Sequence, residues 1–503
     1  MVSFNEVPDD TRVPLFHVEF DGSLAGRQDV FAPSLLIGQM LDTGSVPADT
    51  PVRVSTVEDA KSLFGQGSML AIMMAAFRAS NSVGEVWALP LADNGAGAKA
   101  TGEIAVTGTA TATGTLNLYI DGVRVQVAVA TGDTATEVAT ATAAVINAAK
   151  DLPVTAASNV GDVTLTARHA GELGNVIDLR LNHFGALGGE STPTGIAVAF
   201  TAMGGAGMTV GTSNPSMTAG LANLGDEPFD YIAMPYSDAT SLNTIDTAMG
   251  AATGRWAWNR QVFGHVFNAK RGTLAELGTF GNGRNGRHIC TLGSESTDPA
   301  SVVAKAAAFT AQMARALTND PARPVMTLKL NGLLAPKEAD RFTAAERNTL
   351  LYDGIATSSV DAAGVVQLER AVTHYQTNDF GDPDTAWLDV QTPATLTVFT
   401  REMRGMIQTT FPRMKLVADA ARLNAGQAAV SPRQIKGAII AKYAELERRG
   451  LVENTEAFAT SLIVEKSATD PNRVNVLAKP DLVNQLNVVA MRTQFLLDTP
   501  LAA

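Results

Sequence analysis

The segment Val54–Leu89 is the most informative stretch of the chain, because its capping and turn residues and its apolar runs predict two helices and a strand. Ser55 and Glu58 have the Ser-x-x-Glu spacing of a capping box, in which each side chain bonds the backbone amide of the other residue. We therefore expect a short helix over Thr56–Phe64. Gly65 follows it, and glycine suits the left-handed turn that commonly ends a helix.

A second helix is predicted directly after the first. Ser68 can cap its N-terminus, and the helix spans Met69–Ser80. Its side chains are apolar on almost every face, which is typical of a helix buried between a sheet and another layer. Glu85–Leu91 follows as a predicted strand.

Strands and helices alternate through much of the remaining sequence. Predicted strands are Ser34–Met40, Glu85–Leu91, Phe229–Met234, Val262–Ala269 and His288–Leu292. Predicted helices are Ser237–Ala252, Thr273–Thr279 and Pro299–Leu317. This alternation indicates an α/β body with a largely parallel sheet covered by helices.

An insert interrupts this body from Asp93 to about Ala202, where the composition shifts to Ala, Gly, Thr and Val. Asp121-Gly122 suits the two positive φ angles of a type I′ turn between two strands. A capping box at Thr134 and Glu137 opens a helix. The other predicted elements are strands Leu116–Ile120, Val123–Val129, Val154–Ala157 and Val163–Ala167, and a helix face of Val138, Ala141, Val145 and Ala149. We interpret the insert as a small domain placed in a surface loop, where insertions cost little folding entropy.

Alternating strands are also predicted near both ends of the chain. One apolar face near the start comprises Phe16, Val18 and Phe20, and one near the end comprises Val489, Met491, Thr493, Phe495 and Leu497. Each strand can pair within its own subunit or extend the sheet of a neighbouring copy. The pattern alone leaves both alternatives open.

Several of these segments resemble contractile phage tail sheath proteins. The run Phe64–Ser68, the helix end Phe77–Asn81 and the strand Glu85–Leu89 resemble the helix-helix-strand unit of that family. Further similarity points to its Mu-type branch, in segments Val7–Pro14, Glu19–Asp21, Asp384–Val390, Thr395–Phe411, Asp470–Val476 and Pro480–Leu486. Together they cover the chain outside the insert.

The resemblance implies an α/β multidomain protein with a subtilisin-like α/β body. It also implies an inserted, small, β-rich α+β protruding domain and a C-terminal α+β domain with exchanged terminal strands. The expected boundaries are an arm at 1–21, the body at 22–92 and 203–335, the insert at 93–202, the C-terminal domain at 336–486 and a second arm at 487–503.

By the same resemblance, the subunits polymerise as stacked hexameric rings around a tail tube and contract to drive that tube through the host envelope. The implied partners are other copies of the chain, the tail tube protein, and baseplate and tail terminator proteins. The implied location is the virion tail, after assembly in the host cytoplasm. The resemblance favours inter-subunit contacts through Phe16, Val18, Phe20, Val489, Met491, Phe495 and Leu497. No catalytic site, metal or cofactor is implied.

Composition narrows the possible partners. The 503 residues carry a net charge of −12, which gives no general counterion-release drive for binding nucleic acid. Four basic residues could form a local patch, which we interpret as a solvated face or an interface with acidic neighbours: Arg401, Arg404, Arg413 and Lys415.

The start of the chain lacks the features of a secretory signal. The longest apolar run, Met69–Phe77, is too short for a membrane span. The lone Cys290 excludes an intrachain disulfide and fits a cytosolic folding compartment.

The motifs that could carry chemistry are weak. Gly281–Gly286 matches Gly-x-Gly-x-x-Gly, but it follows a helix and precedes a strand, the reverse of a phosphate-binding turn. Gly211-Thr-Ser213 lies in a predicted loop without the Asp and His motifs of a subtilisin-type protease. The six histidines lack metal-ligand spacing. Asp379, Asp382 and Asp384 crowd one loop that could hold calcium, although a solvated turn is favoured. Tyr231, Trp256 and Trp258 are interpreted as packing residues.

Two other classes of protein fit parts of the pattern. An α/β hydrolase would require a clustered nucleophile and base. A secreted surface-layer protein would also self-assemble, but into sheets and after export. Electron microscopy of the purified protein distinguishes tubes or rings from discrete particles and flat arrays.

Overall fold

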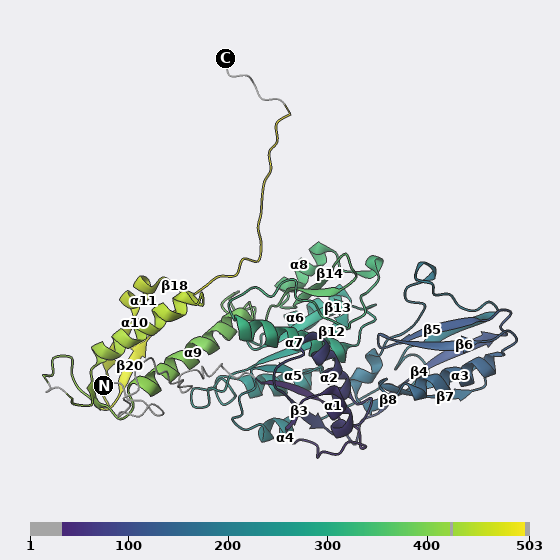
Figure 1. Cartoon of the computed structure of the whole chain (residues 1–503), viewed down its shortest axis with the longest axis horizontal. Helices are drawn as coiled ribbons and strands as arrows, with labels where there is room; N and C mark the ends of the chain where they lie inside the picture. Colours follow the sequence, from purple (N-terminus) through teal and green to yellow (C-terminus); the bar gives the residue numbers. More distant parts are fainter. Residues whose placement is uncertain (1–32, 423–425, 498–503) are drawn as a thin grey trace, which may run out of the picture.

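The computed structural model describes residues 33–422 and 426–497. A central α/β body lies between the β-rich insert at one end of an elongated molecule and a helical C-terminal module at the other (Figure 1). The predicted strand with Phe16, Val18 and Phe20 falls outside the described residues.

Six strands form the body sheet in the order β13 Ile289–Glu295, β12 His265–Gly272, β11 Tyr231–Ala233, β1 Ser34–Gln39, β3 Val86–Leu91 and β2 Val52–Val54. All neighbouring pairs are parallel except β2 with β3. Every residue of β1 is buried, as expected for a central strand covered on both faces. The predicted α/β body with a largely parallel sheet is therefore confirmed.

Six helices accompany this sheet: α1 Val57–Phe64, α2 Met69–Ser80, α4 Thr218–Asn223, α5 Ala239–Met249, α6 Leu274–Asn282 and α7 Val302–Asn319. Helices α2 and α7 pack against each other and both contact β1. The almost wholly apolar α2 buries Leu70, Met73, Met74 and Phe77 in the main core. Its predicted bounds and its Ser68 cap are confirmed.

The predicted cap of α1 is wrong by one residue. Thr56, not Ser55, is the N-cap, because its hydroxyl accepts from the Asp59 amide at 3.1 Å and the Asp59 carboxylate accepts from the Thr56 amide at 3.0 Å. Ser-Thr-Val-Glu-Asp contains two overlapping capping boxes, and local pattern does not choose between them.

The insert contains two antiparallel sheets and one helix. One sheet has the order β10 Ile196–Thr201, β4 Lys99–Gly108, β8 Asp162–Ala170 and β7 Val154–Asn159, and the other β6 Val123–Val129, β5 Gly114–Ile120 and β9 Leu179–Leu181. The helix is α3 Ala135–Ala148, and two short 3-10 turns are Glu172–Val176 and Ala186–Gly188. A hydrophobic cluster separate from that of the body fills this unit.

Two local predictions within the insert hold. Asp121 and Gly122 have φ values of 51° and 84°, as a type I′ turn requires. Thr134 and Glu137 form the predicted capping box. The buried face of α3 is rotated slightly from the predicted one. The helix buries Val138, Thr142 and Ile146. The other predicted positions, Ala141, Val145 and Ala149, are half-buried.

The hairpin turn of the insert packs against the body. A Cβ added to Gly122 would lie 3.2 Å from the Pro299 carbonyl oxygen, so the turn approaches the start of α7 closely. Burial raises the pKa of the neighbouring Asp121 carboxyl to about 6, although a hydrogen bond from Ser301 opposes this shift.

A histidine makes a second connection between insert and body. His169 Nδ1 lies 2.9 Å from Asp93 Oδ1, and its Nε2 lies 3.0 Å from the backbone amide of Met69 at the start of α2. Because an amide only donates, Nε2 must accept, and the proton lies on Nδ1. Asp93 also accepts from Gln39 at the end of β1.

The chain beyond α7 divides between two cores. The 3-10 turn Glu338–Asp340, helix α8 Ala344–Tyr352 and strands β14 Thr357–Val360 and β15 Val366–Arg370 come first. Residues of this stretch, including Val366, Leu368 and Val390, join the body cluster. The sequence predicts one C-terminal domain over 336–486.

The C-terminal module has its own cluster around Ile439, Tyr443 and Phe458. Its elements are α9 Gln391–Thr410, β16 Lys415–Leu416, β17 Ala429–Val430, α10 Pro432–Arg448, β18 Val452–Glu453, α11 Thr455–Ser461, β19 Ile463–Lys466, β20 Val474–Leu477 and β21 Asp481–Leu482. Helix α9 spans both parts, since Ala394 lies in the body core and Phe399 packs on the module core.

Candidate functional site

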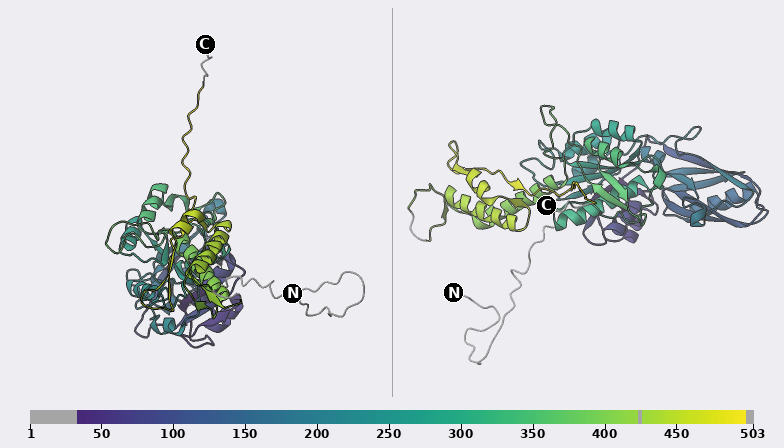
Figure 2. Two further views of the ribbon diagram at one scale, coloured as in Figure 1. Left: turned by 90° about the vertical axis from the view of Figure 1, so that its left-hand side faces the viewer. Right: turned by 90° about the horizontal axis from the view of Figure 1, so that it is seen from above.

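The residues that follow β21 form an extended segment that points away from the rest of the molecule (Figures 1 and 2). Within the described chain, none of residues 483–497 belongs to a strand. From Val488 on, the large apolar side chains of this segment are between 76% and 94% exposed: Val488, Val489, Met491, Phe495, Leu496 and Leu497. No within-chain pairing of the predicted strand Val488–Leu496 is present among the described residues. Exposed apolar stretches of this kind are typical of surfaces that contact another protein, so this segment is the candidate site.

The C-terminal module offers open strand edges. Strands β19 and β20 form a two-stranded antiparallel sheet, and β18 pairs only with β21 among the described strands. Ile463, Val476 and Leu477 on the β19–β20 hairpin are about half exposed. A two-stranded hairpin is marginally stable by itself and has unpaired amides and carbonyls along its edges. It can therefore accept a further strand.

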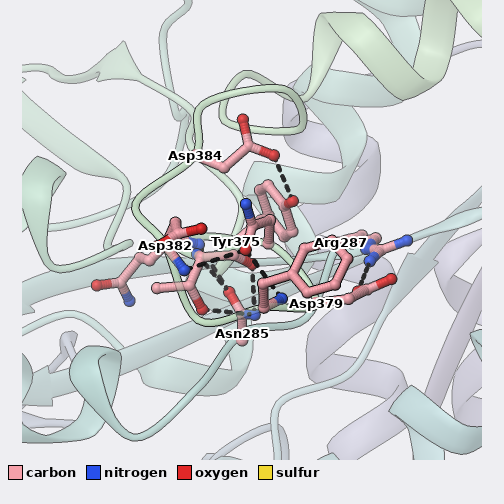
Figure 3. Close-up of polar contacts among 10 residues, drawn as sticks. Asn285, Arg287, Tyr375, Asp379, Asp382 and Asp384 are labelled. Atoms are coloured by element: carbon pink, nitrogen blue, oxygen red, sulfur yellow. Dashed lines mark hydrogen bonds and ion pairs between the residues drawn. The ribbon is translucent and has the colours of Figure 1, made fainter.

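The acidic loop considered for calcium is a hydrogen-bonded hairpin (Figure 3). Arg287 pairs with Asp379 at 2.5 Å, and the Tyr375 hydroxyl donates to Asp384 at 2.6 Å. The described residues contain no group of three His, Cys, Asp or Glu side chains that could hold a metal. The favoured interpretation as a turn agrees with this geometry.

Three histidines that are scattered in sequence lie deep in the body. Trp256 stacks on His288 with ring centroids 4.1 Å apart, and His265 lies 5.8 Å from His288. Burial lowers the pKa of His265 and of His374 to about 3, and burial also holds the pKa of His288 well below its usual value. The three imidazoles are therefore uncharged packing groups at neutral pH.

The three aromatic residues assigned to packing differ in burial. Tyr231 is buried, and Trp256 packs against the edge of the core as predicted. The prediction for Trp258 is wrong, because that side chain is 81% exposed. It lies on the loop between α5 and β12, and its neighbour Ala257 takes the buried position instead.

The remaining candidate motifs have structural roles. Gly281–Gly286 lies between the end of α6 and β13, so no helix N-terminus follows it to bind phosphate. Ser213 lies in a loop, as predicted, and in the described part of the chain no histidine hydrogen-bonds to it. Cys290 is buried in β13, where burial raises the pKa of its thiol.

The four basic residues considered for a local patch do not share one solvated face. Arg401 is mostly buried and donates two hydrogen bonds to Asp230, at 2.6 and 2.7 Å, and Arg404 bonds Gln261. Both residues therefore tie α9 to the body. Arg413 and Lys415 are exposed beyond the end of this helix. The solvated-face interpretation is wrong for Arg401.

Comparison with known proteins gives a consistent result along the chain. The phage tail sheath protein beta-sandwich domain matches residues 95–197, the central domain 211–374 and the C-terminal domain 382–496. The Mu-like prophage FluMu tail sheath protein of Haemophilus influenzae is 42% identical over 498 residues, which cover 99% of this chain and 100% of that protein. The chain belongs to the phage tail sheath family. The resemblance to phage tail sheath proteins is thereby confirmed.

Solved tail sheath structures are also similar to this tail sheath chain. The sheath tail protein of Desulfitobacterium hafniense has a TM-score of 0.48 and 12% identity, over 94% of this chain and 97% of that one. The helical sheath of the anti-feeding prophage in its contracted state has a TM-score of 0.44 and 10% identity, over 97% of this chain and 100% of that one.

Membership of the phage tail sheath family establishes the broad class of function. The chain is a structural subunit of a contractile phage tail and not an enzyme. The hydrolase and surface-layer interpretations are wrong. Within the described residues, no helix is long and apolar enough to cross a membrane.

A surface feature that the sequence pattern did not reveal is the exposed Phe380, which is 91% accessible at the tip of the acidic loop. The signal was present as Asp379-Phe380-Gly381-Asp382, an aromatic residue within a turn motif.

Proposed function

We propose that this chain assembles as stacked hexameric rings around a tail tube, and that contraction of the stack drives the tube through the host envelope. Assembly would take place in the host cytoplasm, with baseplate and tail terminator proteins at the two ends of the sheath. The observation that carries the proposal is the extended C-terminal segment, whose apolar side chains have no partner within the described chain.

The proposed link between subunits is strand exchange. The backbone of residues 488–496 pairs with an open edge in a neighbour's C-terminal module, and the β19–β20 hairpin is the receiving surface. Val489, Met491, Phe495 and Leu497 then cover apolar positions such as Ile463 and Leu477, which are half exposed in the isolated chain. Strand addition supplies main-chain hydrogen bonds and pockets for alternate side chains.

The N-terminal residues Phe16, Val18 and Phe20 are proposed as a second exchanged strand. If each arm makes ~6 hydrogen bonds at ~1 kcal/mol net, the links hold each subunit by several kcal/mol. They would stay paired while the larger body surfaces slide. The free energy of contraction would come from surface buried only in the contracted state, multiplied over many subunits.

The proposed division of the chain follows its cores. The subtilisin-like α/β body, with the insert emerging from it, would extend to the start of α9, because residues up to Ala394 join the body cluster. The C-terminal α+β module would then run from α9 to β21. The contacts of Arg401 with Asp230 support movement of body and module as one unit.

Removal of residues 1–21 tests the exchange. We expect a folded, soluble monomer that does not form sheaths, because the body and the module each have their own core. Sedimentation measures the polymer, and thermal unfolding measures the fold. Full-length sheaths from the truncated protein would contradict the exchange of this arm.

Replacement of the insert tests whether it belongs to the lattice. Ala98 and Thr212 form an isolated antiparallel bridge, so the two connections to the insert lie side by side. A short Gly/Ser linker in place of residues 99–211 should leave assembly intact, because the insert has a separate core. Electron microscopy would show thinner tubes.

The control for this deletion is the folding of the shortened body. All four tryptophans lie outside the replaced residues, at positions 87, 256, 258 and 387, so their fluorescence reports on the body alone. A body that unfolds normally but forms no polymer would place the insert in the lattice.

A further inference from the structure

The loop after His374 presents an aromatic side chain on a fixed turn. Phe380 is 91% exposed, although phenylalanine is usually buried. Asn378 Oδ1 accepts from the amides of Phe380 and Asp382 at 2.9 and 3.0 Å, and the Asn378 amide donates to the Asp382 carbonyl at 2.9 Å. Gly381 takes the left-handed φ of 88° that closes the turn.

The base of this hairpin is fixed to the body. Asn285 Oδ1 accepts from the amides of Gln376 and Thr377 at 2.7 and 3.1 Å. The Arg287 guanidinium lies over the Tyr375 ring, 5.4 Å from its centroid, and pairs with Asp379 (Figure 3). A surface that is already ordered loses little conformational entropy when it binds.

A groove of about 690 Å³ lies along the C-terminal half of α7 and the segment after it. Pro324, Met326 and Leu328 contribute apolar lining, and Arg315, Arg323 and Lys329 contribute positive charge. Lys329 lies 3.5 Å from Asp361, and Asp320 also lines the groove. Arg315 and Arg323 form no ion pair with any described residue. The groove is thus a locally basic, partly apolar site on a chain of net charge −12.

We propose that the Phe380 hairpin of one copy docks in this groove of a second copy. The ring packs against Met326 and Leu328, while Asp379 and Asp382 face Arg315 and Arg323. An aromatic anchor with complementary charges around it is the usual composition of an energetic centre in an interface. The inference rests on the proposed polymerisation, and it adds a contact outside the exchanged arms.

The geometry of this contact suits a polymer. Hairpin and groove are two different surfaces of the same chain, so each copy offers one and receives the other. Such a heterologous contact continues from copy to copy as a ring or a helix, whereas a contact between two like surfaces closes as a dimer.

Cross-linking between two preparations that each carry one introduced cysteine tests the docking. Cys290 is buried and is the chain's one native cysteine, so introduced thiols react selectively. Asp382→Cys protein and Arg323→Cys protein are mixed, assembled and treated with a short bis-maleimide. We expect a cross-linked dimer from the mixture under assembly conditions and none from either preparation alone.

Asp162→Cys, at the exposed first residue of β8 in the insert, replaces Asp382→Cys as the matched control.

Charge reversal gives an independent readout. Among the described residues, neither the Asp382 carboxylate nor the Arg323 guanidinium forms an ion pair within its own chain. Variants that reverse either charge should therefore fold normally. Arg323→Asp and Asp382→Arg should each raise the protein concentration needed for assembly about tenfold, and the double variant should recover most of that loss. Phe380→Ala should weaken assembly at least as much.

Three outcomes would overturn the docking. The first is that the mixed Asp382→Cys and Arg323→Cys proteins form a normal polymer but give no cross-linked dimer. The second is normal assembly of both charge-reversal variants. The third is loss of assembly in Arg323→Asp that Asp382→Arg neither reproduces nor rescues, which would assign the groove to another acidic occupant such as residues 1–21 of a neighbour. Each of these leaves the sheath proposal intact, because that proposal fails only if the unaltered chain forms no polymer.

Discussion

Substitution of Phe495 by alanine should weaken assembly by about 2 kcal/mol per subunit, which raises the concentration needed for assembly roughly 30-fold. The side chain is 77% exposed in the isolated chain, so its loss should leave the monomer's thermal stability unchanged. The alanine removes a large apolar contact that we place in a neighbour's module. Sedimentation of the polymer and thermal unfolding of the monomer measure the two effects separately.

Proline substitution tests whether the same segment adds to a sheet. Met491→Pro removes one amide donor and fixes φ, which costs about 3 kcal/mol where a ladder bond was made. Along a strand, successive amides point in opposite directions, so prolines placed in turn at residues 490–494 should impair assembly at alternate positions.

Gln494→Ala is the matched control for Phe495→Ala, because the Gln494 side chain points to the opposite face of the predicted strand.

Two results would count against strand exchange by the C-terminal segment. A large fall in the melting temperature of the monomer would show that the segment pairs within its own chain. Uniformly normal assembly across the proline series would show that its backbone makes no ladder with a neighbour. Either result would leave the exposed apolar side chains without the partner that we assign to them.

Asp298→Ala should destabilise the body by about 3–5 kcal/mol, because it leaves the buried Lys305 ammonium without a counterion. The side chains of Lys305 and Asp298 are 2% and 1% exposed, and the two are directly paired. Lys305 lies in the first half of α7, the helix that packs on both α2 and the sheet. Denaturant unfolding followed by tryptophan fluorescence measures the change.

The matched control is the double variant Asp298→Ala with Lys305→Met, which removes both charges and fills the space with an apolar chain. We expect it to be more stable than Asp298→Ala alone, because replacement of a whole buried pair costs less than removal of one partner. Equal unfolding free energies for the single variant and the unaltered protein would contradict a dry, paired lysine. This change alters folding, whereas Phe495→Ala alters assembly.

The pair of variants also separates two sources of sheath strength. If the body is rigid and the arms are the links, a subunit with a weakened body should still polymerise below its unfolding temperature. A subunit with a weakened arm should fold and fail to polymerise. This division follows from separate cores in the body and the C-terminal module.

Much of the local structure was predictable because short-range bonds determine it. The Ser68 cap, the bounds of α2, the Asp121-Gly122 turn and the capping box at Thr134 each depend on groups within a few residues of each other. The α1 cap was missed for the same reason, since two overlapping boxes satisfy the local rule equally. The alternation of strands and helices also fixed the class of the body.

By itself, the sequence determined the α/β body, the inserted β-rich unit, the apolar alternation of the C-terminal segment and the resemblance to tail sheath proteins. The tertiary structure alone decided which distant surfaces meet. It joined Arg401 to Asp230 across 171 residues, stacked Trp256 on His288, and fixed the hairpin that exposes Phe380. These contacts depend on how the elements pack in three dimensions, because the partners lie far apart in the sequence and share no local period. Helix and strand signals extend over one or two turns of chain, and so they leave such pairings open.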